Sequence, residues 1–217
     1  MIRDKRVMPL PLFPLNVVLF PKMVLPLRIF EERYKQMIAE CLKTNSPFGV
    51  ALIKSGEEVG GPAEPHRVGT LAKIMESRTV NAQGEMELVV RGVRRFRILS
   101  ITQQEPFLRA EVGLKSEVLG DPAVVQRLVS EAEQGLRKLV QAYMDLTQEP
   151  MPDNKLPVPP RDLSYWFAQF LPLSQDHRQD LLEMHSTAQR LEKEVTFLRL
   201  EHLRMEKMIF QKKARLN

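Results

Sequence analysis

The fold is decided by residues 10–37, LPLFPLNVVLFPKMVLPLRIFEERYKQM, where prolines interrupt an apolar run at short intervals. Each proline removes a backbone donor and clashes with the preceding turn, so one continuous helix cannot form here. A membrane span needs about 20 uninterrupted apolar residues, and a secretory signal needs a compact apolar core before its cleavage site. The sequence shows neither pattern. It predicts two short buried strands, at 15–20 and 23–28, with a turn at Pro21-Lys22.

An amphipathic helix follows from Phe30. Glu31 and Glu32 fall in its first turn, where negative charge is favourable. Asn45-Ser46-Pro47 ends the helical pattern. The buried stripe has helical spacing and consists of Tyr34, Met37, Ile38, Cys41 and Leu42.

Short apolar runs separated by turn signals dominate the next segment. Strands are predicted at 48–53, 68–80, 86–90, 93–98 and 106–112, with a bend near Glu76-Ser77, a break at Arg91-Gly92 and a long surface loop at 54–67. Residues 81–84 form a hairpin turn in which Gly84 is free to adopt a positive φ. Many short strands with few helices indicate a compact, barrel-like sheet.

The pattern becomes helical after Gly120. Asp121 suits an N-cap and Pro122 the first helical position. The proline-rich segment 149–160 cannot be helical, and helices are predicted around 163–171, after Ser174, and from Ser186 to about Arg215. The last helix has a coiled-coil-like seam that is a candidate for self-association. Its basic end contains Lys207, Lys212, Lys213 and Arg215, which suit a helix C-terminus.

Several of these segments resemble a known family. The runs at 13–38, 48–53 (FGVALI), 68–74 (VGTLAKI) and 90–98 (VRGVRRFRI) are similar to the amino-terminal, substrate-binding domain of ATP-dependent Lon protease, and in particular to its stand-alone bacterial relatives. The family usually has glycine where Lys22 stands, so a positive φ at this turn would strain a lysine. The resemblance implies an α+β protein: a PUA-like β-rich pseudo-barrel at 1–118, then a helical bundle at 119–217 ending in one long helix.

Signals for catalysis are missing from the sequence. No glycine begins G-x-x-x-x-G-K-[ST], none of the four histidines forms H-E-x-x-H, and Cys41 is the single cysteine. The ATPase and Ser–Lys peptidase modules of full Lon are therefore not encoded here. We expect a non-enzyme without metal or cofactor, and a cytoplasmic location, because one cysteine cannot form an internal disulfide. Cys41 is interpreted as a small buried hydrophobe.

Two features suggest binding. The resemblance implies recognition of unfolded or misfolded polypeptide without contact to a membrane, and an apolar groove between the two subdomains is the candidate site. The alternative for its aromatic residues is packing of the helical part on the barrel. The candidate peptide-binding residues are Tyr165, Trp166, Phe170, Phe20 and Met23.

The second feature is a basic strand. The net charge is +5, and residues 1–117 contain 18 basic and 13 acidic side chains. Arginines crowded around Phe96 can hold phosphate and stack bases, which makes an RNA-binding PUA-like module the alternative function. They can equally pair with Glu76, Glu85 and Glu87 on neighbouring strands. The candidate basic patch is Arg91, Arg94, Arg95 and Arg97.

Overall fold

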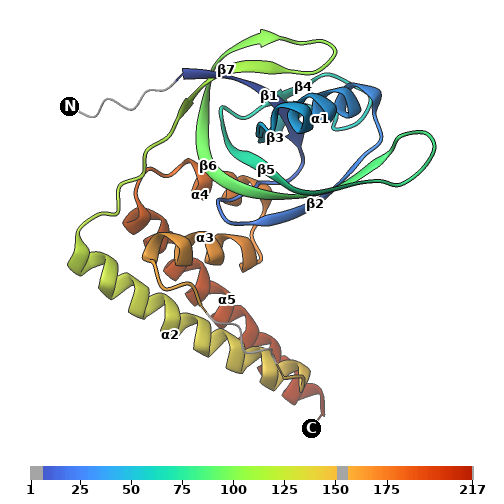
Figure 1. Ribbon diagram of the computed structural model, residues 1–217. Helices are drawn as coiled ribbons and strands as arrows, with labels where there is room; N and C mark the ends of the chain where they lie inside the picture. Colours follow the sequence, from blue (N-terminus) through green and yellow to red (C-terminus); the bar gives the residue numbers. More distant parts are fainter. Residues whose placement is uncertain (1–6, 151–155, 217) are drawn as a thin grey trace. The chain divides into compact units, whose positions relative to one another are not determined.

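The computed structural model describes residues 7–150 and 156–216, and its elements group into two units (Figure 1). The first unit comprises residues 1–116 and 173–183, and the second comprises 117–172 and 184–217. The expected division of the chain into two domains at residue 118 stays a prediction. The first unit contains β1 (Val7–Leu15), β2 (Val24–Ile29), α1 (Glu32–Thr44), β3 (Phe48–Gly56), β4 (Ala63–Pro65), β5 (Val68–Thr79), β6 (Met86–Gln103), β7 (Arg109–Leu114) and α4 (Gln175–Glu183).

The strands of the first unit pair into a ring. The order is β1-β7-β6-β5-β3, and a parallel pairing of β1 with β3 closes it, whereas the other pairings are antiparallel. β2 adds to β6 and β4 adds to β3 outside this ring. The expected α+β architecture is confirmed.

The first strand contains prolines that the sequence analysis treated as breaks. Leu12 N donates to Leu108 O (2.8 Å), so even-numbered residues of β1 donate toward β7. The backbone nitrogens of Pro9 and Pro11, which have no hydrogen to donate, therefore face the opposite side. No hydrogen bond is lost there, because pairing with β3 begins only at Leu12. The strand expected at 15–20 is wrong, because β1 ends at Leu15.

The turn at Lys22 has the geometry that the sequence suggested. Lys22 has φ 72°, in the left-handed region, and its N–H donates to Gly92 O (2.8 Å). Met23 N donates to Phe20 O (3.1 Å), which closes the turn before β2. The strain expected for a lysine in this conformation is thus present.

Helix α1 covers the larger core of the first unit. It buries the predicted stripe except Leu42, which is exposed, and Asn45 (φ 48°) caps its C-terminus. Tyr34 stacks at 4.2 Å on Phe13 of β1. A second core lies among β1, β5, β6 and β7 and includes Leu12 and Phe96.

Helix α4 belongs to the first unit although it follows α3 in sequence. Ser174 Oγ accepts from His177 N (3.3 Å), as the expected cap. Gln179 Nε2 donates to Val68 O (3.0 Å) and holds the helix on β5.

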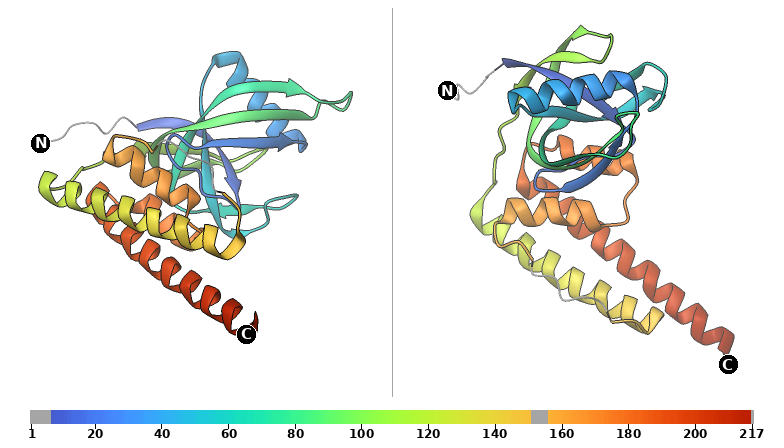
Figure 2. Two further views of the ribbon diagram at one scale, coloured as in Figure 1. Left: turned by 90° about the horizontal axis from the view of Figure 1, so that it is seen from below. Right: turned by 45° about the vertical axis from the view of Figure 1, so that its right-hand side comes forward.

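The second unit consists of α2 (Pro122–Thr147), α3 (Pro160–Phe170) and α5 (Thr187–Leu216). Asp121 Oδ1 accepts from Ala123 N and Val124 N, which confirms the predicted N-cap. Helices α2 and α5 run side by side (Figure 2), with Gly135 against Leu198. Lys212 Nζ donates to Leu146 O (2.8 Å) in the last turn of α2. Residues 151–155 of the connector and the side chains of Lys213 and Arg215 lie outside the described residues.

Candidate functional site

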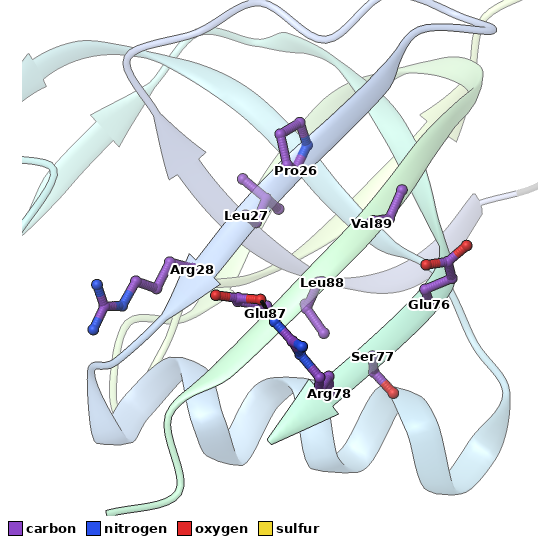
Figure 3. Close-up of a pocket in the computed structure, with 9 residues that line it drawn as sticks. All are labelled: Pro26, Leu27, Arg28, Glu76, Ser77, Arg78, Glu87, Leu88 and Val89. Carbon is purple, nitrogen blue, oxygen red and sulfur yellow. Dashed lines mark hydrogen bonds and ion pairs between the residues drawn. The ribbon is translucent and has the colours of Figure 1, made fainter. Parts of the chain in front are cut away.

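An open groove lies on the sheet face formed by β2, β6 and the outer half of β5 (Figure 3). We call it the arm groove, and its volume is about 590 Å³. Two rows of residues run across β2, β6 and β5. Pro26, Val89 and Glu76 form one row, and Arg28, Glu87 and Arg78 form the next. The groove therefore has one row with two apolar residues beside one row of charges. Its lining is Pro26, Leu27, Arg28, Glu76, Ser77, Arg78, Glu87, Leu88 and Val89.

Both arginines of the arm groove have an acidic partner. Arg78 Nη2 lies 2.5 Å from Glu87 Oε2, and Arg28 Nη2 lies 2.7 Å from Glu85 Oε2. The hydrogen bond from Arg28 lowers the pKa of the Glu85 carboxyl below its ordinary value. Because each arginine has an acidic partner, the groove presents no strong field of one sign.

A second groove, of about 750 Å³, lies between the β3–β4 loop and the turn before β7. Prolines 14, 62, 65 and 106 line it together with Tyr34 and Ile101. Arg33 fixes the loop, because its Nη1 donates to Gly61 O (3.1 Å) and its Nε to Glu31 Oε2 (3.0 Å). The segment predicted as a plain surface loop at 54–67 is thus partly a strand, β4, and is tied to α1.

The aromatic candidates differ in exposure. Trp166 is half-buried and stacks at 4.5 Å on Phe170, which is 63% exposed. Tyr165 is buried, and its hydroxyl donates to Glu117 Oε2 (2.5 Å). Phe20 is buried and Met23 half-buried in the first unit. The groove between the subdomains stays a prediction, and only Phe170 among its five residues offers a largely exposed apolar ring.

The basic candidates do not form one surface. Arg91 and Arg97 are exposed and Arg94 is half-buried, but Arg95 is 2% exposed, and its Nη1 donates to Leu182 O (2.6 Å). The break expected at Arg91-Gly92 is wrong, because β6 continues through both residues. Arg95 lies on the strand face opposite to Phe96, and it is buried because α4 lies over it. The inclusion of Arg95 in a surface patch is therefore corrected.

Arg95 instead stabilises the end of α4. Lys115 Nζ donates to Glu183 O (3.1 Å), so two cations contact the carbonyls of the last turn of this helix. Positive charge is favourable at that position. The acids expected to pair with the basic strand, Glu85 and Glu87, pair with Arg28 and Arg78 instead.

The second unit contains a buried polar cluster that was not predicted from the sequence. Arg190 is fully buried, lies 4.0 Å over the Tyr165 ring, and donates to Glu117 Oε1 (2.6 Å) and Ser164 Oγ (2.7 Å). Burial opposes ionisation of Glu117, but Arg190 and the hydrogen bonds hold its pKa below the ordinary value. The available signal in the sequence was the position of Arg190 next to Leu191, which together with Val195 has the spacing of a buried helix face. The Arg190 side chain is fully buried and that of Glu117 is only 11% exposed, so the cluster offers little accessible surface.

A second acid lies one turn after Arg190. Glu194 is 0% exposed, and burial raises the pKa of its carboxyl well above the ordinary 4.5, although Arg190 opposes the shift. Folding therefore favours the protonated form of Glu194 relative to its ionised form.

The described parts of the chain contain no group of three or more His, Cys, Asp or Glu placed to hold a metal ion. Cys41 is buried, and burial raises the pKa of its thiol, which disfavours the reactive thiolate. None of the helices in residues 7–150 and 156–216 has the length and hydropathy required to cross a membrane.

Comparison with known proteins identifies the family. The profile of the ATP-dependent protease La (LON) substrate-binding domain matches residues 9–199. The chain belongs to this family. Among solved structures, a Lon N-terminal domain protein from Xanthomonas campestris has 30% sequence identity and a TM-score of 0.61, covering 86% of this chain and 96% of that one.

Curated relatives of this Lon substrate-binding-domain chain are much longer. Lon protease of Syntrophus aciditrophicus is 28% identical over 87% of this chain and 24% of its own length. Lon protease of Citrifermentans bemidjiense is 31% identical over 90% of this chain and 25% of its own length. The chain therefore spans about a quarter of these relatives. The N-terminal domain of a Mycobacterium avium complex Lon protease, 18% identical with a TM-score of 0.63, shares the fold.

Proposed function

We propose that this chain is a non-catalytic polypeptide-binding protein that acts as an adaptor or chaperone-like binder of unfolded or misfolded proteins. The observation that carries the proposal is the match of the Lon substrate-binding family to residues 9–199. Recognition requires no covalent step. The absence of a G-x-x-x-x-G-K-[ST] sequence is consistent with this role.

The arm groove is the proposed contact surface. Its apolar pair, Pro26 and Val89, lies across two adjacent strands and is flanked by charges of both signs. Apolar surface of this kind binds polypeptide with little sequence preference. Since the neighbouring arginines are already paired, binding should depend on apolar contact more than on net charge.

The test is binding of a fluorescently labelled, permanently unfolded protein to the full chain and to two variants. Val89→Glu places a charge in the arm groove and is expected to weaken binding at least five-fold. Val93→Glu is the matched control, because Val93 is exposed on the same strand but does not line the groove. Equal binding by both variants would contradict the arm-groove assignment. Loss with Phe170→Glu instead would favour the aromatic residues of α3.

The same experiment separates the RNA-binding alternative. RNA bound through Arg91 and Arg97 should be released by moderate salt, because phosphate contacts are strongly salt-dependent. Polypeptide held by apolar contact should remain bound. Salt-sensitive RNA binding that is lost in Arg91→Ser/Arg97→Ser, together with no capture of unfolded protein, would replace the proposed function.

A further inference from the structure

The first unit has several strand edges that end without a partner among the described residues. Four of them are the outer edge of β2, the outer edge of β4, and the far ends of β5 and β6, in addition to the edge of β1 that contains Pro9 and Pro11. An open edge can bind an extended peptide as an added strand, because it offers backbone donors and acceptors at alternate residues. Each of these edges is interrupted.

On β2 the interruption is Pro26. Gly92 N donates to Met23 O (2.9 Å), which places the odd-numbered residues of β2 toward β6. Val24, Pro26 and Arg28 therefore direct their backbone groups to the open edge. Pro26 lies in the middle of these three and has no N–H to donate. An incoming strand would lose its central hydrogen bond.

On β4 the interruption is Pro65. His66 N donates to Leu52 O (2.8 Å) on the β3 side, so the backbone nitrogen of Pro65 faces the open edge. The strand has only three residues, and Pro62 directly precedes it. Short, proline-bearing edges are a common way to prevent strand addition.

On β5 and β6 the interruptions are β-bulges. Beyond Ala72, β5 pairs only with β6, and an extra residue at Met75 breaks its register. Beyond Ile98, β6 pairs only with β7, and extra residues at Leu99 and Thr102 break its register twice. Bulges twist an edge and disrupt the regular spacing that an added strand needs.

From these four edges we infer that the chain recognises polypeptide through side chains laid on the sheet face, not by adding the polypeptide as a strand. This inference rests on the proposed function. Its substrates are segments that expose apolar side chains, including segments whose own backbone amides are blocked or already hydrogen-bonded. The contact that we infer is therefore with Pro26 and Val89 in the arm groove, and not with a strand edge.

The test uses two labelled peptides on the full chain, measured by fluorescence anisotropy. One is a decapeptide of alternating leucine and serine, and the other is the same peptide N-methylated at alternate residues on one edge. A second methylated peptide blocks the opposite edge, so that either pairing orientation is covered. Methylation removes strand pairing but leaves the side chains unchanged. We expect all three affinities to agree within about three-fold.

The outcomes are distinguishable. A loss of ten-fold or more for either methylated peptide, with tight binding of the parent, would overturn the inference and leave the proposed function standing. Binding of none of the peptides would contradict the proposed function itself, provided that the chain also fails to bind unfolded protein. Equal binding that is weakened by Val89→Glu and not by Val93→Glu supports both.

Discussion

Replacing Lys22 by glycine should stabilise the protein. Lys22 has φ 72°, and its backbone N–H bonds to Gly92 O, an interaction that glycine keeps. A left-handed conformation costs a non-glycine residue about 1–2 kcal/mol. Glycine itself lowers stability by roughly 0.5–1 kcal/mol, because it loses more conformational freedom on folding. The expected net stabilisation is therefore about 1 kcal/mol, the difference of these two terms.

The assay is equilibrium unfolding of Lys22→Gly and Lys22→Ala by denaturant and by heat. Both variants remove the contacts of the lysine side chain, but only alanine keeps the Cβ that causes the strain. Lys22→Gly should exceed Lys22→Ala by about 1 kcal/mol, or roughly 2–4 °C in Tm for a chain of this size. If the chain unfolds in two steps, the gain belongs to the step of the first unit. Equal stability of the two variants would refute a strained turn.

Three further changes probe packing and charge. In Gly92→Ala the new Cβ would lie 2.1 Å from Phe20 O, so we expect a loss of about 3 kcal/mol in unfolding free energy; a loss below about 1 kcal/mol would show that the backbones can separate. Arg95→Met removes the donor to Leu182 O and should cost about 1–3 kcal/mol and increase hydrogen exchange of α4 amides above those of α2. Folding raises the pKa of Glu194 above its ordinary value of 4.5. The contribution of protonated Glu194 to stability is therefore fully present below about pH 4.5 and is lost as the pH rises through the pKa of the folded state. Glu194→Gln should therefore match the wild type in stability near pH 4 and exceed it at pH 8, and a constant difference between these pH values would contradict the buried-acid assignment.

Local signals in the sequence predicted local structure well. Asp121 caps α2, Gly84 has a positive φ (73°), and the stripe around Tyr34 is buried on α1. Lys22 has the left-handed conformation that comparison with the family's usual glycine suggested. Each of these features depends on a few neighbouring residues, and for that reason a single sequence contains enough information to predict them.

Features that depend on pairing between distant residues could not be predicted in the same way. The first strand tolerates Pro9 and Pro11 only because β3 pairs no earlier than Leu12. Arg95 lies on the strand face opposite to Phe96 and is buried because α4, which is far away in the sequence, covers it. No periodicity within one strand records which distant element will cover one of its faces.

The proposed contact surface shows the same limit. The aromatic candidate Tyr165 is buried on Arg190, whereas Pro26 and Val89 form the apolar pair of the arm groove. These two residues are more than 60 positions apart and become neighbours only through the register of β2 on β6.

The central claim is that this Lon substrate-binding-domain chain binds unfolded polypeptide through apolar contact. Titration of the full chain into a labelled, permanently unfolded protein at low and at high salt tests it most directly. Saturable binding with an affinity that changes less than about three-fold between the two salt concentrations is the predicted result. No binding at either concentration, or binding that disappears at high salt, would contradict the claim.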